Sequence, residues 1–407
     1  MKKMNRKGFT IVELVIVIAV VAILAAVLIP TFSSLVKKAN MSADQQAVRQ
    51  MNTLLTAEDA TNKPANVSAA IVAMDASGID MKDYKPLTKD MYFYWIADLN
   101  RVVYTDKNNK VIFPADLAEE VYSVDAGWYS LAGIVAEDDS WESKVEAGAV
   151  EISSGAQLVS LMKAYADKDP AASGVTSVKL TSDVDLKGAS ASFGSMEHKT
   201  FTFDGDGHTI YGMRVDKNTI VADSETSGTK SYYGYGLVGA IAYTDSNVVV
   251  KNVTISDAVI YDTKDVSKTS TVGVIAASVN YGASLTIDNV TVENCYVHGQ
   301  RKVATLVGLV SNGDANGDGI QDIAKLTLKK NISISGTVVG GNESAKIIGA
   351  ITNSAKNIMD IDELGTLTVD VTVKVDSALN DIDSDRTDVQ TAYDYSVLGA
   401  NFGGNIR

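Results

Sequence analysis

Residues 7–14 of the chain read Lys-Gly-Phe-Thr-Ile-Val-Glu-Leu, and they join a short basic leader to a long apolar run. The leader, residues 1–8, contains four basic residues and no acidic one, and between residues 9 and 29 only Thr10 and Glu13 are not apolar. At about 1.5 Å per residue, a helix over this run has roughly the 30 Å length of a bilayer core. The stretch therefore predicts a membrane-spanning helix near the N-terminus.

The order of these features predicts how the chain is processed and oriented. A secretory signal peptide places its small-residue cleavage site after the apolar core, whereas the Gly8–Phe9 junction precedes it here. The apolar run is therefore expected to survive cleavage. Because basic residues gather before the helix, the positive-inside rule places the leader in the cytoplasm. We expect a single-pass membrane protein before any assembly.

Glu13 is not explained by a plain membrane anchor. A carboxylate inside hydrocarbon costs several kcal/mol unless it is paired, and such residues usually have a function. Cleavage after Gly8 would leave an ammonium group on Phe9, one helical turn from Glu13, on the same chain or on a neighbouring subunit. We expect Glu13 to pair with such an N-terminus.

Residues 7–13 resemble the cleavage and methylation motif of type IV prepilins and of type II secretion pseudopilins. The resemblance implies that a prepilin peptidase cuts after Gly8 and that the Phe9 nitrogen is methylated. It also implies that Glu13 docks onto a neighbouring N-terminus in an extracellular filament made with other pilin subunits. Pro30 falls where many pilins carry a helix-bending proline, which removes one backbone hydrogen bond.

The next part of the chain predicts a long stem and a small head. Apolar residues continue at three- and four-residue steps beyond Pro30, so residues 9–61 are expected to form one helix. Residues 62–148 are expected to form a head with a β-meander over Met91–Ile96, Arg101–Thr105 and Val111–Phe113. We expect the aromatic residues 92–95 to form a small core rather than a carbohydrate site.

Residues 149–400 contain a repeat. Alternating strands are expected to begin at Val248, Leu285, Leu326 and Leu367, at steps of 37, 41 and 41 residues, each after a glycine-containing apolar segment. Periods of this size indicate stacked solenoid units that bury a shared core. Residues 154–157 have capping-box spacing, and the short helix expected to follow, over residues 158–165, would cap the first unit.

The repeats resemble right-handed pectate-lyase-like β-helices and glycine-rich repeats of bacterial surface proteins. The expected fold class is α+β overall. It combines a long N-terminal pilin helix and a small β head with a mostly β, right-handed parallel β-helix, and residues 401–407 form a C-terminal tail.

Catalysis on such a fold would start from the segment around residues 201–214. Clustered carboxylates with a basic residue serve acid–base chemistry, and Asp204, Asp206, His208 and Arg214 are the candidates. Turn chemistry accounts for the two carboxylates, and no second acidic pair recurs at the solenoid spacing. We therefore expect no enzymatic activity, although a membrane-tethered protein that binds or degrades polysaccharide remains an alternative.

Residues 314–322 are the candidate metal site. Asp314, Asn316, Asp318, Ile320 and Asp322 offer oxygen donors at alternating positions, as Ca²⁺ requires. The loop resembles calcium loops of the EF-hand and dockerin kind, but Lys325 stands where a bidentate acid would be. Two alternatives stay open, a weak calcium site and an Asx/Gly-rich turn without metal.

Charge and cysteine content limit the function further. The formal net charge is −14, which argues against nucleic acid as a partner because phosphate binding needs clustered Lys and Arg. Cys295 is the sole cysteine, so the chain forms no internal disulfide, and its strand-like surroundings predict a buried side chain. We expect a minor or tip type IV pilin that displays a β-helical domain for adhesion to a surface glycan or protein. A secretion pseudopilin is an alternative.

Overall fold

The computed structural model describes residues 11–59, 63–64, 67–79, 84–108, 110–117, 128–131, 137–216, 233–262, 270–300, 302–314, 317–341, 344–352, 359–361, 363–375 and 389–390. Gly8, Phe9 and Asn316, three of the predicted site residues, lie outside these ranges.

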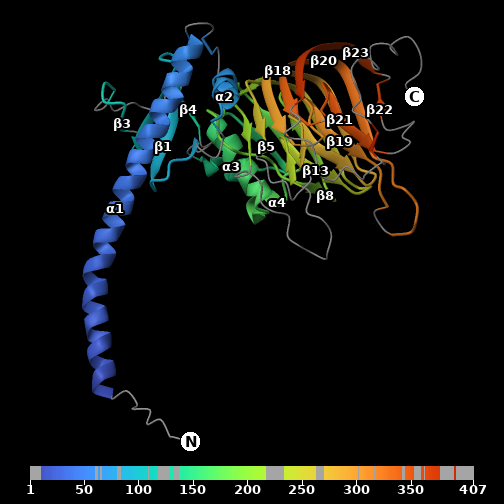
Figure 1. The fold of residues 1–407 in the computed structure, drawn as a ribbon. Coiled ribbons are helices and arrows are strands. Elements are labelled where there is room, and N and C mark those ends of the chain that lie inside the picture. Colours follow the sequence, from blue (N-terminus) through green and yellow to red (C-terminus); the bar gives the residue numbers. More distant parts are fainter. Residues whose placement is uncertain are drawn as a thin grey trace, which may run out of the picture.

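A single long helix, α1, runs from Ile11 to Asp59, as the apolar spacing predicts. It continues through Pro30, and Figure 1 shows that it is bowed along its length. Its first half extends away from the rest of the molecule (Figure 1). In its second half Val48, Met51 and Leu55 are fully buried, so this half forms part of the core of the head.

The head combines the C-terminal half of α1 with helix α2 (Val67–Ala76) and a four-stranded antiparallel sheet. Its strands are β1 (Met91–Ile96), β2 (Arg101–Asp106), β3 (Val111–Phe113) and β4 (Trp128–Ser130), in the order β3-β2-β1-β4. The three predicted strands are confirmed. The aromatic residues 92–95 contribute to the core as expected, since Phe93 and Trp95 are buried.

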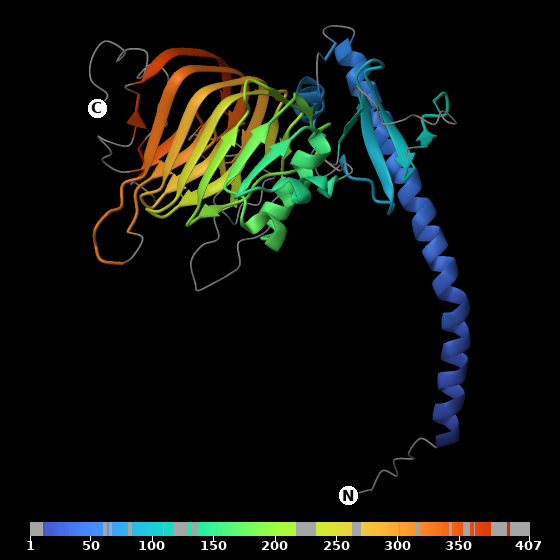
Figure 2. The ribbon, with the colours of Figure 1, turned by 180° about the vertical axis from the view of Figure 1, so that it is seen from behind.

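Two parallel sheets make up most of the remaining chain, and their strands alternate along the sequence. One contains β8 (Met196–Glu197), β13 (Val238–Ala242), β17 (Ala276–Asn280), β19 (Val307–Ser311) and β21 (Ile348–Thr352). The other contains β5 (Ala149–Ile152), β6 (Ser177–Leu180), β9 (Thr200–Asp204), β14 (Asn247–Ser256), β18 (Ser284–Gly299), β20 (Lys325–Gly340) and β23 (Leu364–Val375). Figure 2 shows the strands stacked side by side, each successive one farther from α1.

Shorter elements complete this repeat domain, residues 137–390. The strands that pair with the larger sheet are β7 (Val184–Asp185), β10 (Thr209–Tyr211), β11 (Arg214–Val215), β15 (Val259–Tyr261) and β22 (Met359–Asp360). Strands β12 (Tyr233–Tyr235) and β16 (Ser270–Val272) pair with each other, and β24 (Val389–Gln390) pairs with β21. The helices are η2 (Asp139–Lys144, 3-10), α3 (Gly155–Ala166) and α4 (Pro170–Ser173).

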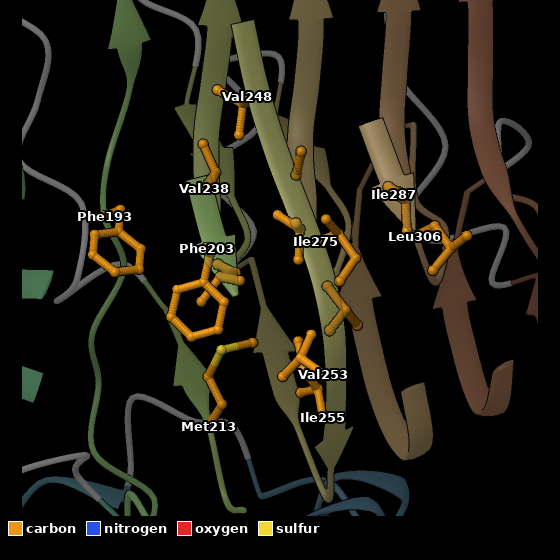
Figure 3. Close-up of a cluster of buried hydrophobic side chains, with 14 of the residues drawn as sticks. Phe193, Phe203, Met213, Val238, Val248, Val253, Ile255, Ile275, Ile287 and Leu306 are labelled. Atoms are coloured by element: carbon orange, nitrogen blue, oxygen red, sulfur yellow. The ribbon is translucent and has the colours of Figure 1, made fainter. Parts of the chain in front are cut away.

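Apolar side chains from both parallel sheets share one interior. Figure 3 shows Phe203, Val248 and Ile287 from the larger sheet and Val238 from the smaller one pointing into it. Because the strands are parallel and in register, side chains at equivalent positions stack on one another and bury each other's apolar surface. Cys295 lies in this core and is buried, as the sequence predicts.

The register confirms two of the predicted repeat steps and corrects the third. Val248 pairs with Leu285 and Leu285 with Leu326. Leu367, however, pairs with Ile332, and Met359 takes the place opposite Leu326, so the predicted start of the fourth strand is wrong. The alternation has a period of two, so a shift by an even number of residues keeps the same face buried and is invisible in the sequence pattern.

Helix α3 lies at the end of the repeat domain nearest the head (Figure 1). The Ser154 hydroxyl accepts a hydrogen bond from the Gln157 amide, as the capping spacing predicts. On its buried face the Tyr165 ring packs edge-on against Phe193, with ring centroids 5.7 Å apart. The helix therefore adds to the same interior as the first strands.

Charged side chains form a row of alternating sign across the larger sheet. Neighbouring strands pair these residues in register, in the order Glu151, Lys179, Asp204, Lys251, Asp288 and Lys329. Lys251 Nζ lies 3.0 Å from an Asp204 carboxylate oxygen. Opposite charges on neighbouring strands contribute roughly 0.2–1 kcal/mol each, so this row favours the observed register.

Reversing one charge in the row is expected to destabilise the sheet. Lys251→Glu would place three carboxylates on adjacent strands and lower the free energy of unfolding by about 1 kcal/mol. Denaturant unfolding of the full-length chain in detergent measures this. Lys374→Glu is the matched control, because Lys374 pairs with the uncharged Val339 of β20. Equal losses in both variants would contradict a role for the row.

Candidate functional site

The first half of α1 presents an apolar surface in every direction. Among the side chains that the structure describes there, the large apolar ones that are exposed are Ile11, Val12, Leu14, Val15, Ile16, Val17, Ile18, Val20, Val21, Leu24, Phe32, Leu35 and Val36. Ile11 is 81% exposed and Phe32 70%. A helix that is apolar all round is normally buried, and an apolar surface of this size marks an interaction site.

The predicted processing and assembly residues fall at this end of the chain. Glu13 and Pro30 lie within α1, whereas Gly8 and Phe9 precede the described residues. Within the described part of the chain, no helix meets the length and apolarity needed to cross a membrane.

A buried carboxylate fixes the head to the second half of the helix. Asp44 is only 2% exposed, and its oxygens accept hydrogen bonds from the amides of Leu87 (2.7 Å) and Thr88 (3.0 Å). The Tyr104 hydroxyl donates to it at 3.1 Å, and burial raises the pKa of this phenol to about 12. Asp44 is not among the site residues predicted from the sequence, although its spacing of four residues from Val48 places it on the buried face.

Side-chain amides complete this attachment. The Asn52 amide nitrogen donates to the Val102 carbonyl at 2.9 Å, and the Val102 amide donates to the Asn52 oxygen at 2.6 Å. Asn52 thereby binds the backbone of β2 as a neighbouring strand would. Asn100 accepts from the Trp95 indole at 3.1 Å and donates to the Leu55 carbonyl at 3.3 Å. The stem and the head therefore form one folded unit.

The candidate calcium loop is organised by its own backbone. Asp314 accepts hydrogen bonds from the amides of Gly317 and Gly319, both at 2.7 Å, and Asp318 accepts from Ile320 at 2.7 Å. Asp322 pairs with Gly313 through the backbone. Among the described residues, no group of three or more His, Cys, Asp or Glu side chains could hold a metal ion. Calcium binding here stays a prediction.

The residues considered for catalysis each contact a different partner. Asp204 contacts Lys251 at 3.0 Å and Asp206 contacts Lys179 at 2.9 Å. His208 Nδ1 lies 3.3 Å from an Asp183 oxygen. The fourth candidate, Arg214, is buried and contacts the head. The contacts of His208 and Asp206, by contrast, lie at the surface.

Comparison with known proteins agrees with this geometry. Residues 3–29 match the family model described as the prokaryotic N-terminal methylation motif. The chain is 38% identical over 94 residues to the type IV wide pilus major component PilA4 of Thermus thermophilus, a match that covers 19% of this chain and 72% of that protein. No solved structure matches the chain.

The exposed apolar helix, the head packed on its second half and the methylation motif together define an exported, pilus-type subunit. Such a motif implies an extracellular filament after assembly. The chain belongs to the type IV pilin family.

Removing the Asp44 carboxylate is expected to loosen the head from the stem. Asp44→Ala would leave the buried Thr88 amide and Tyr104 hydroxyl, and the partly buried Leu87 amide, without this acceptor. Each buried group that loses its acceptor costs about 1–3 kcal/mol. Hydrogen exchange of the full-length chain in detergent is therefore expected to be about tenfold or more faster over residues 84–90. Thr53→Ala is the control, because it removes an exposed hydrogen bond from Thr53 to the Arg49 carbonyl on the same helix. Unchanged exchange in Asp44→Ala would contradict this role.

Proposed function

We propose that this chain is a minor or tip subunit of a type IV pilus, and that it displays its repeat domain at the surface of the filament. The observation that carries the proposal is the exposed apolar half of α1, which matching helices of other subunits would cover. The relative's printed name favours a pilus over a secretion system. The minor position rests on the bulk of the repeat domain, which would crowd every position of a dense fibre.

The N-terminal motif supports a route to that filament. Residues 9–29 would span the membrane with the leader in the cytoplasm before assembly. A prepilin peptidase would then cut after Gly8 and methylate the Phe9 nitrogen. Glu13 would pair with the N-terminus of a neighbouring subunit, which offsets the cost of a carboxylate in an apolar fibre core.

For the repeat domain we propose a β-helix whose function is adhesion. The parallel registers and the shared interior support successive coils of one solenoid. Binding of a surface glycan or protein, rather than catalysis, fits the environment of the acidic candidates, because Asp204 and Asp206 are each engaged by a lysine.

Filament composition tests the proposed position in the pilus. Mass spectrometry of sheared surface filaments is expected to find this chain in small amounts relative to another pilin. Its N-terminal peptide is expected to begin at methylated Phe9. An intact Met1 would contradict the processing route, and a filament built mainly from this chain would contradict the minor position.

Adhesion is tested with the full-length chain in detergent on a glycan array. We expect binding to a defined set of glycans that Asp44→Ala, a change in the head, leaves unaltered. Binding to no glycan would contradict a glycan ligand while leaving the position in the filament intact.

A further inference from the structure

A buried ion pair lies where the repeat domain meets the head. Arg214 Nε lies 3.0 Å from an Asp216 carboxylate oxygen, and both side chains are only 3% exposed. The Ser190 hydroxyl donates to the other carboxylate oxygen at 2.9 Å. Burying two charges is costly unless their remaining hydrogen-bonding groups are satisfied, so a buried ion pair is weak evidence for a gain in stability. The contacts of this pair with the head indicate another role.

Arg214 also contacts the head. Its Nη1 donates to the backbone carbonyls of Ser130, at 3.3 Å, and Leu131. The guanidinium carbon lies 6.0 Å from the centre of the Tyr84 ring, which also belongs to the head. The ion pair of the repeat domain therefore binds the carbonyls at the end of β4.

The backbone of the repeat domain binds the same strand from a second position. The Ser130 amide donates to the Lys187 carbonyl at 3.1 Å. At Gly188, which has a φ of +73°, an added Cβ would lie 3.1 Å from the Ser130 carbonyl oxygen. The Lys187–Gly188 segment thus approaches β4 more closely than a larger side chain would easily allow.

Apolar and aromatic side chains continue the contact. One buried cluster contains Met51 and Leu55 of α1 and Tyr84 of the head together with Tyr261 and Tyr296 of the repeat domain. Tyr261 stacks on His298 with ring centroids 4.3 Å apart. Stem, head and repeat domain therefore all contribute side chains to this cluster.

We propose that the stem, the head and the repeat domain move as one rigid body, and that the Arg214–Asp216 pair holds the repeat domain in a fixed orientation on the head. Domains on one chain usually move relative to each other unless their interface is large and apolar, and a shared buried cluster removes that freedom. The strands stack sideways from α1, so β23 lies at the end of the larger sheet remote from the stem (Figures 1 and 2). In a filament with its stems along the axis, the repeat domain would project laterally at a fixed angle.

This inference goes beyond the proposed adhesion, because it concerns how the domain is held and not what it binds. Distances between spin labels test it on the full-length chain in detergent. Labels are placed at Lys107→Cys in the head and Thr368→Cys on β23, two exposed positions. The native Cys295 is buried, which raises the pKa of its thiol to about 12 and keeps it from reacting.

The doubly labelled parent is expected to give one narrow distance distribution. The double change Arg214→Met, Asp216→Leu keeps side chains of similar volume but removes the ion pair and its hydrogen bonds to the head. It is expected to broaden the distance distribution and add new distances. The matched control, Lys179→Met with Asp206→Leu, removes an exposed ion pair of the same domain and is expected to leave it narrow.

Two results would overturn the proposal. One is a broad distance distribution in the doubly labelled parent, which would contradict a rigid body even if the double variant does not fold. The other is a folded Arg214→Met, Asp216→Leu variant whose distribution stays as narrow as the parent's. Neither result depends on filament assembly or on a glycan, so the proposed function is tested separately.

Discussion

Parallel pairing between successive strands is the constraint on which the repeat domain depends. Each strand of the larger sheet satisfies its backbone through neighbours that lie far away in sequence, so no strand is stable alone. The register of this pairing then determines which side chains face the interior and which charges lie next to each other. It stacks Val248 on Leu285 and Leu326 in the interior, and it aligns the charges of alternating sign outside. A slip by one residue would exchange the two faces.

The stem obeys a different constraint, because one helix serves two environments. Around Met51 it supplies apolar side chains to the head, and around Val17 it leaves them exposed for a partner. Asp44 belongs to the buried half, where three donors converge on its carboxylate. Polar groups that would be costly in an apolar core are used to fix the geometry where the head packs on the stem.

Local patterns predicted much of this molecule, and long-range contacts account for what they missed. The prepilin motif, the strands around Tyr94 and the helix that follows Ser154 are signals carried by adjacent residues. The predicted start of the fourth strand was wrong, because alternation at Leu367 is equally compatible with several registers. The hydrogen bonds of Asp44 and Arg214 with the head join residues 40 or more positions apart, which no spacing rule specifies.

The charge row has a consequence for how the repeat domain can change its length. Its signs alternate from Glu151 at one edge to Lys329 five strands later. Duplicating a single repeat would copy one sign and set two equal charges side by side, whereas duplicating two adjacent repeats preserves the alternation. Electrostatics therefore favours growth or shortening of this domain by pairs of repeats, so that variants of different length would differ by an even number of strands in the larger sheet.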